Sequence, residues 1–376
     1  MALDGLARGL VRLGHAVDFR PLRTRTPNHT FNRWLYNRQV TARPPTADIV
    51  VGVDLDGYQW AKARARRYPS LIEDGDPRRV PKPPDASGHR SSGSLPSGGP
   101  PFRSQPFPGP RYVVALKGII ADELQNEHGL VRALLGIQAR WERVNVTAAE
   151  RVIVPSRYSA AIAQAAYGVE PWRVAVVPEP IDLAEWRRRF GEVPAPSASR
   201  PPTVLCVARL YPRKRVGDLL TAAVHLRARI ADVRIRIVGE GPESARLRAM
   251  HAELALGDTV AFLGDVSRRE LAVEYVRAHC FCLPTVQEGF GLVFTEAMAA
   301  GLPVVACRAA AVPEVVEDRR TGLLVNPRAP EELAMAMETL LRNSGLTAAM
   351  GEAGRQRVEA FGLQAVAARF VTAVGG

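Results

Sequence analysis

Two glutamates lie beside a glycine-rich turn in the segment PTVQEGFGLVFTEAMAAGLPVVA (284–306). The segment follows an apolar run, passes through Gly289 and Gly291, and continues as a helical pattern. A helix that begins at such a turn presents free backbone N–H groups and the positive end of its dipole, which suit a diphosphate. Glu288 lies on the turn and Glu296 lies farther along the helix. One carboxylate can therefore face a sugar while the other accepts hydrogen bonds from ribose hydroxyls.

A second group of charged residues follows the apolar run TVLCVA (203–208). Arg209 and Lys214 come after the carboxyl end of this predicted strand, on a loop that precedes a helical pattern. Two cations on such a loop can neutralise a leaving diphosphate without a metal ion. An R-x4-K spacing in a basic protein is also typical of solvated surface charges, so the spacing alone leaves both interpretations open.

Two weaker motifs follow other predicted strands. The segment IVGEGPE (237–243) contains Gly239 and begins like a dinucleotide-binding fingerprint, but Ser244 stands where the third glycine would be. Asp54 and Asp56 form a D-x-D, a pattern that can bind a metal ion and is common by chance. NAD binding and a metal site of this type are minor alternatives.

The four cysteines, Cys206, Cys280, Cys282 and Cys307, lie mostly in apolar runs, which indicates buried thiols in a reducing compartment. Cys280 and Cys282 form a C-x-C, but no His or Cys pair nearby completes a metal site, so we expect no metal. No 18-residue window is apolar and uncharged, and the first residues contain no continuous apolar stretch. We therefore expect a cytoplasmic protein without a transmembrane segment or signal peptide.

The composition favours a globular protein with an anionic partner. The chain has 376 residues, 47% of them hydrophobic and 23% charged, which suits two domains and excludes a wholly disordered chain. Its net charge is +12, and 46 of its 50 basic residues are Arg. This excess favours a phosphorylated small molecule or an acidic membrane surface, although a compositional bias explains it equally well. The basic residues are not interleaved with aromatic ones, so we expect no nucleic acid partner.

Short apolar runs alternate with helical patterns in both halves of the chain, which is typical of parallel sheets covered on both faces. From 74 to 110, 22 of 37 residues are Pro, Gly or Ser, and we expect a disordered insertion there. A Pro-rich segment at 179–202 separates two such blocks, so the predicted class is α/β with two doubly wound domains and a ligand cleft between them. The predicted strands lie in 47–67 and at 111–118, 151–156, 173–178, 203–208, 233–239, 259–264, 279–284, 302–307 and 321–326.

The motifs of the second half resemble, in order, those of family 4 retaining glycosyltransferases. EGFGLVFTEAMAAGLPVVA looks like the E-x7-E signature of that family, with Glu288 and Glu296 as its glutamates. VARLYPRKR resembles the V-x-R-L-x4-K element, and IVGEGPE, FLG and PEVVEDRRTGLLV match later landmarks. The first half resembles the family more loosely.

The resemblance implies a GT-B fold, in which two Rossmann-like domains face a central cleft. Residues 1–180 would form the acceptor-side domain, residues 181–360 the nucleotide-sugar domain, and residues 361–376 a helix that returns to the first domain. The implied reaction transfers a sugar from a UDP- or GDP-sugar to a hydroxyl acceptor, which is a glycan, a lipid or a small molecule. The anomeric configuration is retained, and neither a metal nor another cofactor is expected. Peripheral contact with the inner face of an acidic membrane stays open, although we see no clear basic amphipathic helix that would anchor it.

The resemblance also implies a role for each matching residue. Arg209 and Lys214 would neutralise the leaving pyrophosphate, Glu288 would contact the donor sugar near its anomeric carbon, and Glu296 would bind the ribose hydroxyls. The remaining donor contacts are expected from Phe290, Gly291, Leu292, Gly239 and Lys117.

Three departures from the family pattern leave an alternative open. Residues 1–13 already have the pattern of the first helix, so the first strand and its glycine-rich loop are missing from their expected place. Lys117 stands where a histidine is frequent, and Ala310-Ala311 replace a Gly-Gly. The main alternative is a catalytically inactive GT-B relic that binds nucleotide or acts as a scaffold. A sugar-nucleotide epimerase of the same fold and a basic surface-binding module are lesser alternatives.

Overall fold

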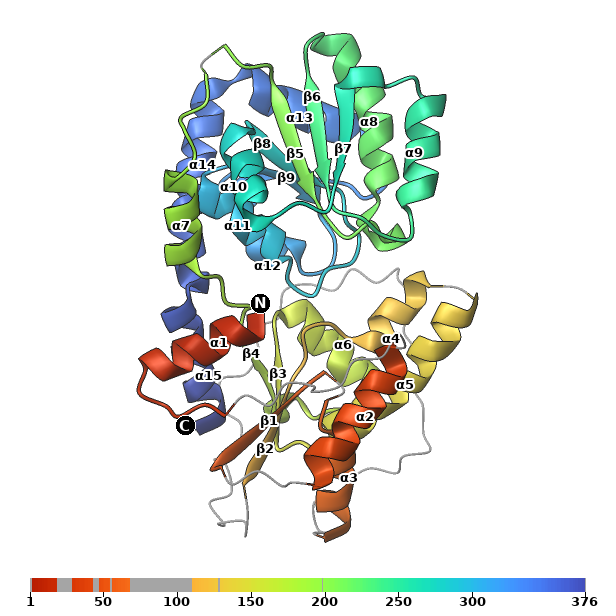
Figure 1. Ribbon diagram of the computed structural model, residues 1–376, viewed down its shortest axis with the longest axis vertical. Helices are drawn as coiled ribbons and strands as arrows, with labels where there is room; N and C mark the ends of the chain where they lie inside the picture. Colours follow the sequence, from red (N-terminus) through yellow and green to blue (C-terminus); the bar gives the residue numbers. More distant parts are fainter. Residues whose placement is uncertain are drawn as a thin grey trace. The chain divides into compact units, whose positions relative to one another are not determined.

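The computed structural model describes residues 2–18, 29–42, 47–54, 56–67, 110–127, 129–197 and 199–375 (Figure 1). The chain divides into two compact units. The large unit comprises Met1–Asp18 and Pro178–Val371, and the small unit comprises Phe19–Val177 and Thr372–Gly376. The predicted insertion at 74–110 lies outside the described residues apart from Pro110.

The small unit contains a four-stranded parallel sheet with the order β1-β2-β3-β4. The strands are β1 (Ile49–Val53), β2 (Arg111–Ala115), β3 (Arg151–Val154) and β4 (Val174–Val176). The helices are α2 (His29–Ala42), α3 (Tyr58–Arg67), α4 (Ile120–Glu123), α5 (Gly129–Ala148) and α6 (Arg157–Tyr167). Ser156 caps α6 by accepting a hydrogen bond from the Ser159 N–H at 3.0 Å, as its position at the end of a strand predicts.

The large unit contains a six-stranded parallel sheet with the order β10-β9-β8-β5-β6-β7. The strands are β5 (Thr203–Val207), β6 (Arg234–Val238), β7 (Val260–Gly264), β8 (Cys280–Leu283), β9 (Val304–Cys307) and β10 (Gly322–Val325). Its helices are α1 (Ala2–Arg12), α7 (Leu183–Gly191), α8 (Val216–Arg229), α9 (Ser244–Glu253), α10 (Arg268–Arg277), α11 (Leu292–Ala300), α12 (Val312–Val315), α13 (Pro330–Arg342), α14 (Ser344–Val358) and most of α15 (Leu363–Gly375). Each strand that the sequence predicts is present, and all the pairings are parallel.

The order of these strands reverses direction at β5. The chain runs from β5 to β6 and β7 on one side and then returns to place β8 on the other side of β5, with Leu205 opposite Phe281. Such a switch point leaves room beyond the carboxyl ends of the two strands, and ligands of open α/β sheets bind there. The loops after β5 and after β8 are therefore neighbours, although they lie far apart in the sequence.

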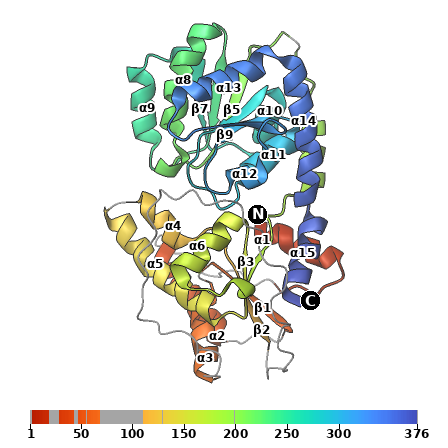
Figure 2. The ribbon, with the colours of Figure 1, turned by 180° about the vertical axis from the view of Figure 1, so that it is seen from behind.

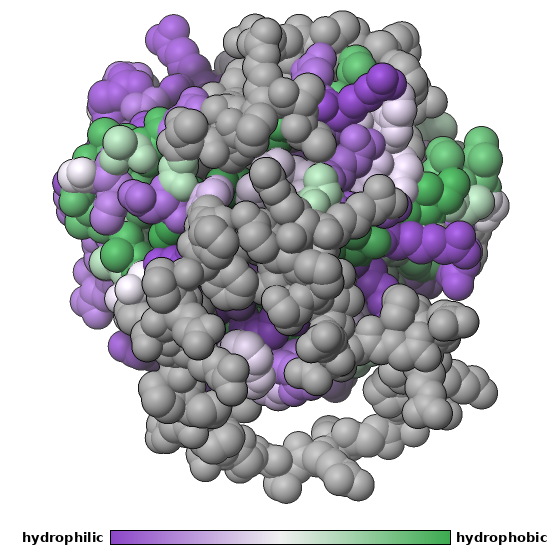
Figure 3. All heavy atoms as spheres, turned by 90° about the horizontal axis from the view of Figure 1, so that it is seen from below, coloured by the Kyte–Doolittle hydropathy of each residue, from purple (hydrophilic) through white to green (hydrophobic). Residues whose placement is uncertain are grey.

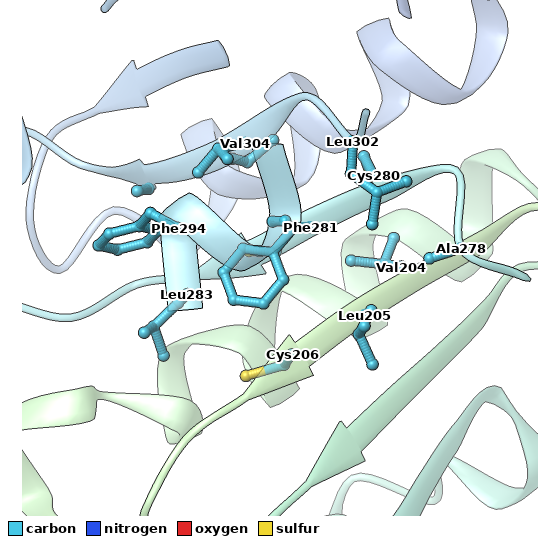
Figure 4. Packing of buried hydrophobic residues seen from close by; sticks show 14 of the residues in the cluster. Val204, Leu205, Cys206, Ala278, Cys280, Phe281, Leu283, Phe294, Leu302 and Val304 are labelled. Carbon is cyan, nitrogen blue, oxygen red and sulfur yellow. The ribbon is translucent and has the colours of Figure 1, made fainter. Parts of the chain in front are cut away.

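The core of the large unit is built from the apolar residues of its central strands. Leu205, Phe281 and Phe294 are fully buried, and the Phe281 and Phe294 rings meet edge to face with centroids 6.0 Å apart (Figure 4). Cys206 belongs to the same cluster, and all four cysteines are buried free thiols, as the sequence predicts. Such a rigid core fixes where each strand ends and hence where the site residues begin.

Helix α1 packs on α15 within the large unit (Figure 2). A Cβ on Gly9 would lie 2.6 Å from the Leu363 carbonyl oxygen, and one on Gly5 would lie 3.1 Å from the Leu363 side chain, so two glycines one turn apart permit the close approach. Arg8 also forms an ion pair with Asp182 at 2.6 Å. Residues 1–18 therefore group with the second half of the chain, whereas the sequence places them in the first domain, and only residues 372–376 of the C-terminal helix group with the small unit.

On the face drawn in Figure 3, polar and apolar residues of the described part of the chain are mixed. Figure 3 shows hydrophobic side chains that reach the surface in several patches between hydrophilic ones. Among the described residues, no helix has the length and apolar character needed to cross a membrane.

Candidate functional site

The loop after β5 packs against the glycine motif that follows β6. A Cβ on Gly239 would overlap the carbonyl oxygen of Ala208, and a Cβ on Gly241 would lie 2.6 Å from the amide nitrogen of Leu210. Glycine is needed at both positions because the two backbones meet there. This packing is a sufficient reason for the G-x-G motif, so the motif does not require a bound dinucleotide. It also fixes the start of the loop that carries Arg209.

Lys214 and Glu288 meet at the switch point. The Lys214 Nζ forms an ion pair with Glu288 Oε1, and the two side chains are only 13% and 10% exposed. The main chain joins the same two loops, because the Val286 N–H donates to the carbonyl oxygen of Arg213 at 3.0 Å. The hydroxyl of Thr285 donates to the same oxygen at 3.2 Å. Two predicted catalytic residues thus contact each other across strands β5 and β8.

The first turn of α11 follows Glu288 directly. Gly291 has φ +91°, and a Cβ there would lie 2.5 Å from the ring of Phe294, so this turn requires glycine. The Phe290 side chain is buried and fixes the entry to the helix. The amide of Leu292 has no acceptor within the helix, because the first N–H groups of an α-helix never do. The predicted glycine turn and helix start are present, and the first amides of α11 follow Glu288, the partner of Lys214, by a few residues.

Glu296 lies on the same helix and is a buried residue, 9% exposed. The hydroxyl of Tyr275 donates a hydrogen bond to Glu296 Oε2 at 3.0 Å. Burial raises the pKa of Glu296 to about 7, although the Tyr275 hydrogen bond and the charge of Arg268 oppose this rise. Burial thus favours the protonated form of this carboxyl, and Tyr275 and Arg268 favour its ionised form.

Arg209 is the exposed member of the predicted set. Its guanidinium lies 3.8 Å from Asp265, which follows β7, and the two side chains are 62% and 68% exposed. An exposed ion pair of this kind contributes little to stability. Arg209 can therefore exchange Asp265 for an anionic ligand at small cost.

Lys117 lies in the small unit, whereas the other eight predicted site residues lie in the large unit. The Lys117 N–H donates to Asp54 Oδ1 at 2.7 Å. The Asn145 side-chain amide donates to the carbonyl oxygens of Asp54 and Asp56, at 2.7 and 3.2 Å. Among the described residues, which exclude the Leu55 of the D-x-D, no three His, Cys, Asp or Glu side chains gather as metal ligands would. The predicted contact of Lys117 with a donor stays a prediction.

Two family models together match almost the whole chain. The model described as "Glycosyltransferase Family 4" matches residues 2–185, and the model described as "Glycosyl transferases group 1" matches residues 192–357. This chain belongs to glycosyltransferase family 4. Its two parallel sheets with alternating helices are those of the GT-B fold.

Relatives of this family 4 chain include bacterial enzymes with two different names. A GDP-mannose-dependent alpha-(1-6)-phosphatidylinositol monomannoside mannosyltransferase of Mycobacterium tuberculosis is 37% identical over 190 residues, 49% of this chain and 48% of that protein. A D-inositol 3-phosphate glycosyltransferase of Catenulispora acidiphila is 34% identical over 235 residues, 59% of this chain and 55% of that protein. The chain thus spans about half the length of the curated relatives it matches.

Solved structures share the fold at low sequence identity. WaaG, a glycosyltransferase involved in lipopolysaccharide biosynthesis, is 17% identical with a TM-score of 0.67, over 100% of this chain and 95% of that chain. Sucrose-phosphate synthase from Thermosynechococcus elongatus is 22% identical with the same TM-score, over 94% of this chain and 80% of that chain. At these identities the likeness shows the fold alone.

Ala310 and Ala311, where the sequence resemblance leads us to expect Gly-Gly, lie in the loop before α12. Ala310 has φ +50°, a left-handed conformation that favours glycine. The Ala311 N–H donates to the carbonyl oxygen of Glu288 at 3.2 Å. The loop before α12 therefore supports the main chain of Glu288 with an alanine in a strained conformation.

Sequence reasoning missed Tyr275 and Asp265. Tyr275 is a single aromatic residue in a helical pattern, and no spacing relates it to Glu296. Asp265 follows a predicted strand, and its position at the carboxyl edge could have been noticed. Its proximity to Arg209 depends on the order of the strands in the sheet, which cannot be predicted from the sequence alone.

Proposed function

We propose that this protein transfers a hexose from a UDP- or GDP-activated donor to a hydroxyl acceptor, with retention of configuration and without a metal ion. The observation that carries the proposal is the Lys214–Glu288 ion pair at the switch point, next to the glycine turn that begins α11. A cation, an acid and free helix amides in one place suit a sugar diphosphate, because each part of such a donor finds a complementary group.

The proposed chemistry uses the charges of the large unit. When the bond between the sugar C1 and the phosphate oxygen breaks, negative charge develops on the leaving diphosphate, and Arg209 and Lys214 stabilise it. Lys214 exchanges the carboxylate of Glu288 for a phosphate oxygen when the donor binds. Glu288 is then free to accept a hydrogen bond from the donor sugar, while Glu296 accepts hydrogen bonds from the ribose. The acceptor oxygen forms the new bond to C1, and its proton goes to the leaving phosphate.

The relatives suggest which substrates to try first. The mycobacterial relative is GDP-mannose-dependent by name, and other relatives are named for D-inositol 3-phosphate. We infer that GDP-mannose is the first donor to test, with UDP-glucose as the comparison. Acceptors that carry an inositol or a mannose are the first candidates, as free sugars and as lipids.

A peripheral membrane contact is also part of the proposal, and we assign it to α5. Leu130, Leu134 and Ile137 recur at helical spacing on α5 and are 76%, 38% and 43% exposed. Arg132 and Arg140, on the same helix, are exposed as well. The sequence alone did not single out this helix as amphipathic. Sedimentation with phosphatidylglycerol vesicles tests the contact, and Leu134→Glu should abolish it.

Calorimetry tests the donor site. We expect heat with GDP or UDP in the presence of EDTA, and turnover of the matching sugar nucleotide under the same conditions. Glu288→Gln should keep or increase the nucleotide affinity, because Lys214 then has no carboxylate partner to exchange. Turnover should fall at least about 100-fold, because the carboxylate acts on the sugar. Glu352→Gln, an exposed glutamate on α14, is the matched control.

Each outcome separates one alternative. Absence of heat with every nucleotide would refute the proposal, and binding without turnover of any donor would support the inactive nucleotide-binding relic. A product with inverted anomeric configuration, read by NMR, would refute the retaining mechanism.

A further inference from the structure

We propose that Tyr275 is a positioning residue for the donor site, because it holds one oxygen of Glu296 and leaves the other free for the ribose of the nucleotide. This inference rests on the proposed function and names a residue that the family motifs do not include. Tyr275 itself does not touch the donor.

The geometry of the Glu296 carboxylate supports this role. Tyr275 is fully buried on α10, and its hydroxyl donates to Oε2 at 3.0 Å. Across the described residues, no other hydrogen bond to this carboxylate is present, so Oε1 has no protein partner. Glu296 as a residue keeps 9% of its surface exposed, and Oε1 is not among the fully enclosed polar atoms that lack a partner, so a ligand hydroxyl can reach it.

Aromatic side chains from two other elements hold the Tyr275 ring. Trp186 and Phe190 of α7 contact it edge to face, with centroids 5.6 and 6.2 Å away. Phe281 of β8 stacks on it at 6.2 Å and is itself fully buried beside β5 (Figure 4). A ring enclosed in this way has one orientation, so its hydroxyl fixes the Glu296 carboxylate without any adjustment by the ligand.

Besides the Tyr275 hydrogen bond, the charge of Arg268 lowers the pKa of Glu296. Arg268, the first residue of α10, attracts the ionised carboxyl. On α7, Arg189 is paired with Glu185, and on α14, Arg355 contacts the carbonyl oxygen of Ala300 near the other end of α11.

The protonation state of Glu296 links Tyr275 to the donor. Burial raises the pKa of Glu296 to about 7, and the Tyr275 hydrogen bond opposes the rise. An ionised carboxylate accepts hydrogen bonds from ribose hydroxyls better than a protonated carboxyl. Tyr275 therefore keeps more of the carboxyl in its binding form at neutral pH.

The test is the pH dependence of nucleotide affinity, measured by calorimetry with GDP or UDP from pH 5.5 to 9.5. Wild-type affinity should increase through about pH 7. In Tyr275→Phe the midpoint should move up by about one to two pH units, and the affinity at pH 7 should fall roughly tenfold, with a smaller difference above pH 9. In Glu296→Gln this step should disappear, and adding Tyr275→Phe to it should have no further effect.

The matched control is Tyr167→Phe, which removes a tyrosine hydroxyl from another buried carboxyl, that of Glu142 in the small unit. Its nucleotide affinity should follow the wild-type pH profile. Melting curves show whether each variant folds. If Tyr275→Phe does not fold, wild-type protein with 3-fluorotyrosine at its eight tyrosines provides a second measurement. Fluorination makes the hydroxyl a stronger donor, so the midpoint should move to lower pH.

The failures are distinguishable. If the wild-type protein binds no nucleotide, the proposed function fails and this inference fails with it. If the wild type binds, but Tyr275→Phe keeps the wild-type midpoint or its effect adds to that of Glu296→Gln, the inference is overturned while the proposed function stands. An unchanged midpoint in the fluorinated protein would also overturn it.

Discussion

Replacing Glu142 by glutamine should remove a large pH dependence from the stability of the small unit. Glu142 is fully buried, and its Oε2 accepts hydrogen bonds from the Ile120 N–H at 2.9 Å and from the Tyr167 hydroxyl. Its Oε1 has no hydrogen-bond partner among the described residues. Burial raises the pKa of Glu142 to about 8, the Tyr167 hydrogen bond opposes the rise, and the charge of Asp54 adds to it.

The sign of the effect follows from proton binding. The folded protein keeps a proton on Glu142 that the unfolded chain releases, so the unfolding free energy falls as pH rises from 4.5 to about 8. At about 1.4 kcal/mol per pH unit, the loss is at most about 5 kcal/mol, because water can enter the site when the carboxyl ionises. Glutamine is neutral at every pH and keeps an acceptor for Ile120 and Tyr167. The variant should therefore lack this loss.

Urea unfolding at pH 5 and pH 9 measures the difference. Tryptophan fluorescence reports mainly on the small unit, which contains four of the five tryptophans. With a slope of about 2 kcal/mol/M, the wild-type midpoint should fall between these pH values by up to about 2 M more than that of Glu142→Gln. Glu170→Gln, an exposed glutamate of the same unit, should behave like the wild type. Equal losses in the wild type and in Glu142→Gln would refute the reasoning.

Three substitutions in the large unit, one of them with a matched control, test its site. Arg209→Ala should change the unfolding free energy by less than about 0.5 kcal/mol, since its side chain is 62% exposed. The same variant should bind GDP or UDP roughly tenfold more weakly. Unchanged affinity in calorimetry would contradict the role assigned to Arg209. Ala310→Gly should raise the unfolding free energy by about 0.5 to 1 kcal/mol in thermal melts, because it relieves a left-handed φ of +50°, and a decrease would argue against that strain. Gly239→Ala should lower the unfolding free energy by more than about 3 kcal/mol, because its Cβ would overlap Ala208. The control Gly257→Ala, where a Cβ meets open space, should lower it by about 1 kcal/mol. Equal losses would disprove the packing explanation.

Most strands of this protein are predictable from sequence because they are short apolar runs, whereas β6 carries two arginines, Arg234 and Arg236, among its five residues. A parallel strand covered on both faces has no polar side, so TVLCVA, HCFCLP and LPVVAC are recognisable without any knowledge of their neighbours. The turn at Gly289 and Gly291 is predictable for a similar local reason, since helix starts depend on a few adjacent residues.

Contacts that depend on strand order are not predictable in this way. The sequence does not reveal that β8 pairs with β5 on the side away from β6. The Lys214–Glu288 ion pair therefore cannot be predicted from the spacing of the two residues. The same holds for Tyr275, whose hydroxyl reaches Glu296 only because α10 and α11 pack side by side. Gly239 was assigned a donor contact by resemblance, and its packing against Ala208 explains the glycine without one.

The Lys214–Glu288 pair has a consequence for the unliganded protein if the proposed function holds. Both side chains are nearly buried, and a buried charge without a partner costs several kcal/mol. Each residue therefore compensates the charge of the other while the site is empty. The donor replaces both partners at once, with phosphate for Lys214 and a sugar hydroxyl for Glu288. Because Arg209 is exposed, it can meet the diphosphate before this exchange. The buried pair would then supply the selectivity of the site, and the exposed arginine the first attraction.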